Sequence, residues 1–145
     1  MAQSEHLLSG TKLWLSLFRA YRSVEKIDLE SVKALGFACI TDFALLEILL
    51  HLGPLPVSTI GKKVLLTSGS VTSAIDRAEK AGLVERSRDT KDRRTVIVAL
   101  TTKGQQRIQI AFTEHAKNLD LAFTKLSAEE RKQLVLLLAK VRNQD

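Results

Sequence analysis

The 145-residue sequence has a single cysteine and no long apolar run. Cys39 cannot form an internal disulfide, and the spacing of a structural zinc cluster is absent. No apolar run reaches the ~18 residues that span a bilayer, and the first residues lack the basic start and apolar block of a secretory signal peptide. We therefore expect a soluble, cytoplasmic protein with no membrane partner, no metal and no other cofactor.

Residues that could perform catalysis are also scarce. Cys39 with one of the three histidines is the only cysteine–histidine combination, and nothing fixes the two partners close together. The sequence has no glycine-rich phosphate loop and no metalloenzyme motif. We therefore expect that the protein is not an enzyme. The composition, 45% hydrophobic and 26% charged, is instead typical of a folded domain.

Metal sensing is a weak alternative. Glu47 and His51 are four residues apart on a predicted helix and could face one ion, as could Glu114 with His115, or His6. Three scattered histidines without a tight pair make a poor ligand set. Because His115 lies on an apolar helical stripe, we expect it to pack in the core or in a dimer interface.

The distribution of charge is uneven. The formal net charge is +6. Between Lys62 and Arg107 there are eleven Lys and Arg against five Asp and Glu, whereas the rest of the chain has eleven of each. One segment therefore carries the whole excess. This favours an anionic partner such as DNA, with a merely solvated charged face as the alternative.

Apolar spacing predicts helices before this basic segment. A first helix lies within residues 5–26, and Asp28 caps a short second helix that Gly36 ends. Thr41 caps a third helix, which Gly53-Pro54 ends. The third helix is apolar nearly all round, so we expect it to be central.

Two short helices and two strands are predicted in the middle of the chain. The first helix runs from Val57 or Ser58 to Val64, and the second begins at Thr67 or Ser68 and ends at Gly82. The apolar period then changes from about 3.6 to 2. Residues 83–88 and 95–100 are predicted strands around the polar tip 89–94, which together make a hairpin.

Two more helices are predicted at the C-terminal end. Thr101 begins a long helix whose apolar stripe continues to Leu126. Residues 127–130 form a capping box, so a last helix runs from there to about Arg142. The apolar faces of the first and last helices are too broad for one small chain to cover, which favours a homodimer.

The order helix, tight link, helix and hairpin is that of a winged helix-turn-helix. The second of these helices, residues 68–81, begins with short side chains that fit the ~12 Å major groove of DNA. Its hydroxyls reach base edges, and its first amides suit phosphate oxygens. The predicted contacts, with Arg77 further along and Lys63 in the preceding helix, are Ser68, Ser70, Thr72, Ser73, Arg77 and Lys63.

The hairpin tip provides a second predicted DNA contact. A basic loop can follow the duplex and insert an arginine into the narrow minor groove. Lys91, Arg93 and Arg94 supply the charge, and Asp92 is placed to hold the Arg94 guanidinium by a charge-assisted hydrogen bond. A basic tip directly after a helix of this kind is more specific than a basic loop alone.

Five motifs resemble the MarR family of bacterial transcriptional regulators. They are residues 55–61 (LPVSTIG), 68–72 (SGSVT), 83–86 (LVER), 89–94 (DTKDRR) and 100–104 (LTTKG). The resemblance implies a mainly α fold with a two-stranded wing and a homodimer. It implies dimerisation helices in residues 5–36 and 102–145 and a DNA-binding lobe in residues 41–101. The helix 68–81 would enter the major groove and Arg94 the minor groove of an inverted-repeat operator.

The resemblance also implies repression that a small effector or an oxidant relieves. The family's pocket lies between the dimer helices and the DNA-binding lobe, and a phenolic or quinone-like effector is expected there. The side chains that would line it are Trp14, Phe18, Tyr21, Phe37, Cys39 and Phe43. The family's peroxide sensors carry their reactive cysteine in the first helix, where this chain has none, so Cys39 is more simply a buried small hydrophobe.

Two other classes of binding protein remain open. A DNA-packaging protein without an effector would bind any duplex with a steep salt dependence, whereas a regulator prefers its operator by ~10³ or more. A winged helix used only for protein contacts is disfavoured by the basic excess. We expect a dimeric, effector-responsive repressor.

Overall fold

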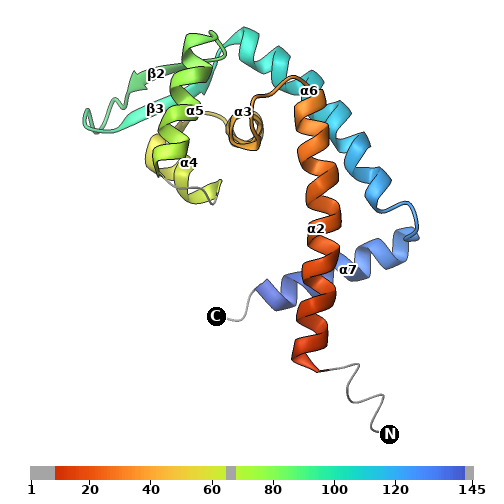
Figure 1. Ribbon diagram of the computed structural model, residues 1–145. Coiled ribbons are helices and arrows are strands. Elements are labelled where there is room, and N and C mark those ends of the chain that lie inside the picture. Colours follow the sequence, from red (N-terminus) through yellow and green to blue (C-terminus); the bar gives the residue numbers. More distant parts are fainter. Residues whose placement is uncertain (1–8, 65–67, 143–145) are drawn as a thin grey trace, which may run out of the picture. The chain divides into compact units, whose positions relative to one another are not determined.

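The structure, a computed structural model, describes residues 9–64 and 68–142, and the side chains of residues 68 and 69 are not among the described parts (Figure 1). The chain divides into two compact units. One, the terminal unit, combines Met1–Asp28 with Ala116–Asp145, and the other, the central unit, is Leu29–His115. The expected mainly helical fold with a β-hairpin is confirmed.

The first described helix, α2, is a single helix from Gly10 to Ala34. The predicted break at Asp28 is wrong, because the residues after it include neither glycine nor proline and continue the helical hydrogen bonding. The predicted stop at Gly36 is confirmed. This glycine has φ 81°, and the N–H of Phe37 donates to the carbonyl of Val32 at 3.3 Å, as in a Schellman cap.

Helix α3, Ile40–Leu52, is central as predicted, with Phe43, Leu45, Leu46 and Leu49 buried. Its N-cap is Cys39 in extended conformation, so the prediction of Thr41 as the cap is wrong. No side chain caps the first turn at Cys39; the negative charge of Asp42 lies there instead, where the helix dipole favours it.

Helices α4 (Val57–Lys63) and α5 (Ser68–Lys80) follow, as the sequence predicts. The predicted opening at Thr67 lies outside the described residues. Strands β2 (Val84–Arg88) and β3 (Val96–Leu100) form the predicted hairpin, pairing Val84 with Leu100 and Arg88 with Val96. A third strand, β1 (Leu55–Pro56), pairs with β3, so the antiparallel order is β1-β3-β2. Its two residues are too few to show alternation, and the sequence did not predict it.

Helix α6 is Thr102–Ala122, with Thr101 as its cap. The Thr101 hydroxyl accepts from the N–H of Gly104 at 3.0 Å and donates to the carbonyl of Gly82 at 2.6 Å. Gly104 lies so close to β2 that a Cβ there would be 1.8 Å from the carbonyl oxygen of Leu83. Only glycine permits this approach between α6 and the start of the wing.

Helix α7, Ala128–Arg142, begins with the predicted capping box. The N–H of Glu130 donates to the Ser127 hydroxyl at 3.3 Å, and the N–H of Ser127 donates to the Glu130 carboxylate at 2.8 Å. Hydrogen bonds from Ser127 to the Glu130 carboxylate lower the pKa of Glu130, that from the Ser127 backbone N–H contributing most. Along the described residues no helix has the length and apolarity to cross a membrane.

The hydrophobic core lies in the central unit. Its buried apolar residues run from Val32 to Ala111, and Ile60, Ala74, Ile75, Val98 and Ile108 are fully buried. Helix α7, in contrast, has no buried residue. The terminal unit instead exposes large apolar side chains, namely Leu13, Trp14, Leu15, Leu17, Phe18, Tyr21, Leu121 and Leu134–Leu138.

Candidate nucleic-acid interface

Helix α5 presents a small polar face to solvent. Ser70, Thr72 and Ser73 are exposed, while Val71 and Ile75 anchor the opposite face in the core. The apolar spacing that predicts the helix thus also orients its hydroxyls outward. Ser68 is the first residue of α5, and its side chain lies outside the described residues. Lys63, at the end of α4, is exposed.

The wing tip is a turn held by hydrogen bonds from the backbone and a hydroxyl to two carboxylates. The carboxylate of Asp89 accepts from the N–H of Lys91 at 2.7 Å, and that of Asp92 accepts from the N–H of Arg94 at 3.0 Å and the hydroxyl of Thr95 at 3.1 Å. The predicted bond from Asp92 to the Arg94 guanidinium is therefore not made, because a backbone N–H two residues away satisfies the same oxygen. The side chains of Lys91, Arg93 and Arg94 are exposed.

A groove of about 500 Å³ lies between α5 and the wing. Thr72 of α5 and Arg94 of the wing both line it, together with Ser58 and Arg86. Two of the predicted DNA contacts from separate elements are thus brought to one cavity. Sequence reasoning missed Ser58 and Arg86, although Arg86 belongs to the LVER motif.

Arg86 connects the wing to α5. Its guanidinium forms ion pairs with Asp76 through Nη2 and with Glu79 through Nη1. The two carboxylates are one helical turn apart on α5. These interactions raise the pKa of Arg86, and the hydrogen bond that Arg86 donates to Asp76 contributes most. The residue therefore stays charged and directed at the helix.

Arg77, predicted as a DNA contact, pairs with α3. Its Nη2 lies 2.5 Å and its Nε 3.1 Å from Asp42 Oδ1, and Nη2 lies 3.6 Å from Cys39 Sγ. The hydrogen bond that Arg77 donates to Asp42 is the main cause of a raised pKa of Arg77. The side chain is still 48% exposed, so one side of the guanidinium faces solvent.

The six predicted effector-pocket residues fall in both units. In the terminal unit, Trp14, Phe18 and Tyr21 are exposed, and the Trp14 and Phe18 rings are 5.8 Å apart. In the central unit, Phe37 and Phe43 are buried, with their rings edge to face at 5.2 Å. Cys39 is exposed at the start of α3, so the expectation that it is buried is wrong. Its position as N-cap keeps it at the surface.

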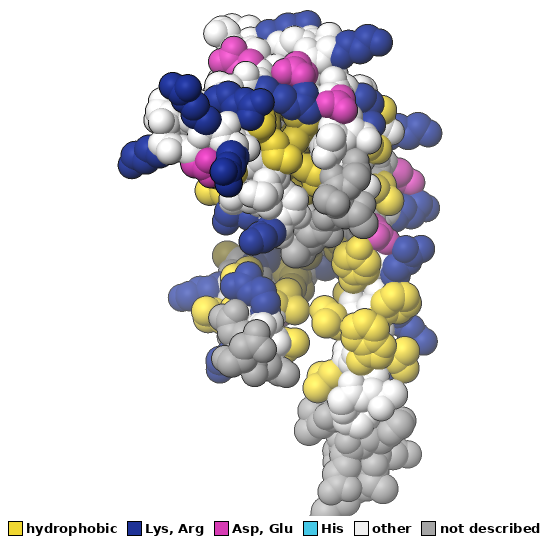
Figure 2. Space-filling model, turned by 90° about the vertical axis from the view of Figure 1, so that its left-hand side faces the viewer, with side chains coloured by type: hydrophobic (Ala, Val, Ile, Leu, Met, Phe, Trp, Pro, Cys, Tyr) yellow, Lys and Arg dark blue, Asp and Glu magenta, His cyan; other side chains and the backbone are white. Residues whose placement is uncertain are grey.

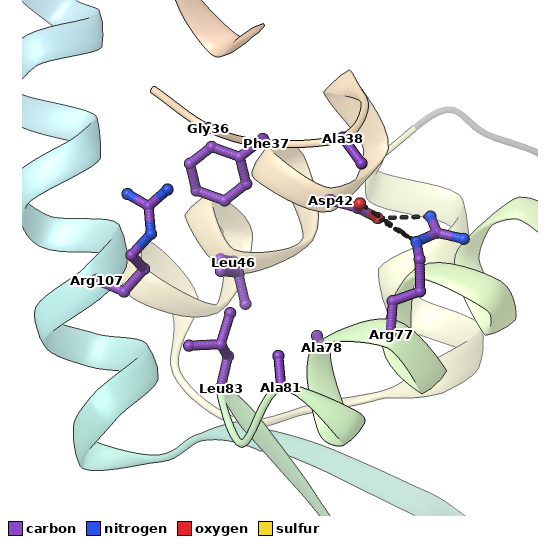
Figure 3. Close-up of a pocket in the computed structure, with 10 residues that line it drawn as sticks. All are labelled: Gly36, Phe37, Ala38, Asp42, Leu46, Arg77, Ala78, Ala81, Leu83 and Arg107. Atoms are coloured by element: carbon purple, nitrogen blue, oxygen red, sulfur yellow. Dashed lines mark hydrogen bonds and ion pairs between the residues drawn. The ribbon is translucent and has the colours of Figure 1, made fainter. Parts of the chain in front are cut away.

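A cavity of about 240 Å³ lies inside the central unit beside α5 (Figure 3). Phe37, Leu46 and Leu83 point into it, and Arg107 and Arg77 lie on opposite sides. The Arg107 guanidinium stacks over Phe37 at 4.4 Å from the ring centre and donates to the carbonyl of Leu35. Asp42 also lines the cavity, where it pairs with Arg77.

The histidines show no metal site among the described residues, in which no three His, Cys, Asp or Glu side chains gather closely enough to hold an ion. Glu47 and His51 line a separate cavity between α3 and α4. His115 is buried as predicted, with Nδ1 2.9 Å from the Ser31 hydroxyl and its ring 4.6 Å from that of Phe43.

Positive charge gathers around the wing and α5. Figure 2 shows many Lys and Arg side chains over this part of the surface, with only a few Asp and Glu among them. A surface of this kind attracts the phosphates of nucleic acid. On this surface a helix with small hydroxyl side chains lies beside a basic hairpin.

Comparison with known proteins gives one consistent result. The MarR family model matches residues 40–96. The HTH-type transcriptional regulator YkoM of Bacillus subtilis is 38% identical over 94% of this chain and 88% of its own length. The HTH-type transcriptional regulator MhqR of the same organism is 36% identical over 90% of this chain and 89% of its own length.

A solved structure describes the regulation of DNA binding of Bordetella bronchiseptica BpsR by 6-hydroxynicotinic acid. It matches with a TM-score of 0.79 at 24% identity, over 91% of this chain and 99% of that one, which shows a common fold. With the winged helix-turn-helix geometry and the sequence identity to YkoM, these matches show that the chain belongs to the MarR family of DNA-binding transcriptional regulators.

Proposed function

We propose that this regulator is a repressor that binds an inverted-repeat operator as a homodimer and is released by a small phenolic or quinone-like effector or by an oxidant. The observation that carries the proposal is the groove shared by Thr72 on α5 and Arg94 on the wing. A helix and a hairpin that meet there can read the major and the adjacent minor groove together.

In this proposal, α5 lies in the major groove. Ser68, Ser70, Thr72 and Ser73 contact base edges and phosphates, and Lys63 contacts the backbone. Arg77 uses the exposed side of its guanidinium for a phosphate while Asp42 holds the other side. On the wing, Arg94 enters the minor groove, Lys91 and Arg93 contact phosphates, and Asp92 fixes the turn.

A second copy of the chain covers the exposed apolar face of the terminal unit. The support is the set of large apolar side chains on α2 and α7, including Trp14 at 60% and Leu137 at 58% exposure. A patch of this extent is unusual on a monomer. Two-fold symmetry would place the two α5 helices about one DNA turn, ~34 Å, apart.

The proposed effector is a small aromatic molecule or an oxidant. BpsR, whose DNA binding is regulated by 6-hydroxynicotinic acid, supports a small aromatic ligand for a chain of the same fold. Trp14, Phe18, Tyr21, Phe37, Cys39 and Phe43 are the proposed lining. Cys39 is exposed, which an oxidant requires.

The test is binding to the duplex upstream of the protein's own gene, compared with a scrambled duplex of equal length, at ~150 mM salt. A preference of ~10³ with one dimer per inverted repeat is the expected result. Equal affinity for both duplexes, and for unrelated genomic fragments, would favour the DNA-packaging alternative. Transcription from that promoter in vitro, with and without the protein, then separates repression from activation.

A further inference from the structure

We infer that Asp76, Glu79 and Arg86 are specificity-determining residues for DNA. The two carboxylates hold the guanidinium of Arg86 and so fix the wing relative to α5, and they also keep that cation from binding the phosphates of any duplex. The inference rests on the proposed reading of DNA by α5 and the wing.

The geometry is that of a two-point clamp. Each terminal nitrogen of Arg86 binds a different carboxylate, one from Asp76 and one from Glu79. The guanidinium is planar and its donors are in a rigid arrangement, so two such bonds fix orientation as well as distance. A lysine ammonium could bind both carboxylates with its three donors, but these rotate and would not fix the orientation.

The clamp lies where it can fix the position of the wing relative to α5. Strand β2 follows α5 through the turn at Gly82, where the N–H of Leu83 donates to the carbonyl of Ala78 at 2.8 Å. Arg86, three residues further, is the second attachment. It pairs with Val98 of β3, so its position is transmitted to both strands that carry the tip. Arg86 also lines the groove with Thr72 and Arg94.

The charge of the clamp argues for a role beyond affinity. Two carboxylates against one guanidinium leave a net charge of −1 beside a surface that otherwise attracts phosphate. Every cation released to phosphate would strengthen binding to any duplex, so the clamp weakens sequence-independent binding. The Asp76 and Glu79 side chains are 62% and 42% exposed, and ion pairs of this exposure contribute little to stability. Asp76 and Glu79 therefore contribute to the position of the wing and to the selectivity for DNA rather than to stability.

The test compares Asp76→Asn/Glu79→Gln with the matched control Asp120→Asn/Glu129→Gln. The control also removes two exposed carboxylates, but from the terminal unit, where Asp120 pairs with Arg131 at 2.9 Å. The probes are the inverted repeat that the wild-type protein selects from a pool of random duplexes, and a scrambled version of it. Affinities are measured between 50 and 300 mM NaCl.

We expect the clamp variant to bind the scrambled duplex roughly fivefold more tightly at ~150 mM salt, with a salt slope steeper by about 0.9 per protomer, because one cation per protomer becomes available to phosphate. The preference for the inverted repeat should fall about tenfold or more, because the wing is no longer fixed. The control should change neither quantity. An unchanged preference, with or without a general gain in affinity, would overturn the inference.

Arg86→Gln separates the clamp from simple repulsion. It breaks the clamp but leaves both carboxylates in place. Affinity for the inverted repeat should therefore fall about tenfold while that for the scrambled duplex does not rise. Wild-type affinity for the inverted repeat in this variant would also overturn the inference.

Amide hydrogen exchange in the DNA-free protein tests the clamp independently of the proposed function. In Asp76→Asn/Glu79→Gln, exchange across Val84–Leu100 should accelerate relative to α3, whereas the control should match the wild type. Unchanged exchange would show that the clamp does not fix the wing. A wild-type protein without any preferred duplex would instead refute the proposed function, and the exchange result would still decide the role of the clamp.

Discussion

Gly104→Ala is the sharpest test of the packing between α6 and the wing. The added Cβ would be 1.8 Å from the carbonyl oxygen of Leu83, whereas ordinary contacts are well over 3 Å. The obstacle is backbone, so no side chain can rotate away. The N-terminal turn of α6 would have to move by more than an ångström. Overpacking of this kind costs about 1–3 kcal/mol.

The displacement would also break the cap of α6. The N–H of Gly104 donates to the Thr101 hydroxyl, and the N–H of Thr101 donates to the same Leu83 carbonyl at 3.0 Å. Loss of a cap adds ~1 kcal/mol. We therefore expect the free energy of unfolding to fall by roughly 3 kcal/mol, a large part of the ~5–15 kcal/mol of a typical domain.

Urea unfolding followed by circular dichroism measures this loss, with Gly61→Ala as the matched control. Gly61 is also helical, in α4, but a Cβ there would meet nothing within 4 Å. Its replacement should be neutral or stabilising by up to ~1 kcal/mol, because alanine favours helix. If Gly104→Ala lost less than ~1 kcal/mol relative to this control, the close approach of α6 to Leu83 would be refuted.

Five further substitutions test the DNA contacts, the dimer and the helix cap. Arg94→Ala should weaken operator binding by about 1–3 kcal/mol in electrophoretic titrations; unchanged affinity at ~150 mM salt would remove the wing from the mechanism. Ser70→Ala and Thr72→Ala should change the sequences selected from a random duplex pool more than the salt slope, and identical selections would contradict the role of α5. Leu136→Asp, at a position 55% exposed on α7, should convert dimer to monomer in sedimentation equilibrium, and a persistent dimer would place the interface elsewhere. Hydrogen bonds from Ser127 lower the pKa of Glu130 below its ordinary value of 4.5. The stabilising effect of the Glu130 carboxylate is therefore present above pH 4.5 and is lost as the pH falls through the lower pKa of the folded state. Glu130→Gln should show a smaller loss of thermal stability between about pH 5 and 3 than the wild type, and equal losses would dispute the capping bond.

Features that depend on neighbouring residues were predictable from the sequence. The stop at Gly82, the capping box of Ser127 and Glu130, and the hairpin all follow from residues within a few positions of one another, and all are present. Local sequence patterns give a wrong prediction where one residue can form either of two local interactions. Asp92 can bind either the Arg94 guanidinium or the Arg94 N–H, and the nearer backbone donor is the one it binds. Similarly, Asp28 can cap a helix or continue one.

Interactions between distant residues were not predictable. Arg77 and Asp42 are 35 positions apart, and Arg86 is ten positions from Asp76. Nothing in a single sequence distinguishes these arginines from those that face solvent, so the sequence predicts only a DNA contact for Arg77 and no site for Arg86. The exposure of Cys39 likewise depends on how α3 packs in the core.

The construction of the wing tip has a consequence for how this regulator can diverge. The turn is held by the Asp89 and Asp92 carboxylates and by Arg88, whose Nη1 donates to the Arg93 carbonyl at 2.9 Å. In the contacts described for these residues, the side chains of Arg93 and Arg94 take no part in holding it. The residues that shape the tip are therefore distinct from Arg93 and Arg94, which we propose contact the DNA. In the proposed mode of binding, new operator preferences can arise by exchanging Arg94 without loss of the turn, whereas a change at Asp92 would alter the shape of the tip and recognition together.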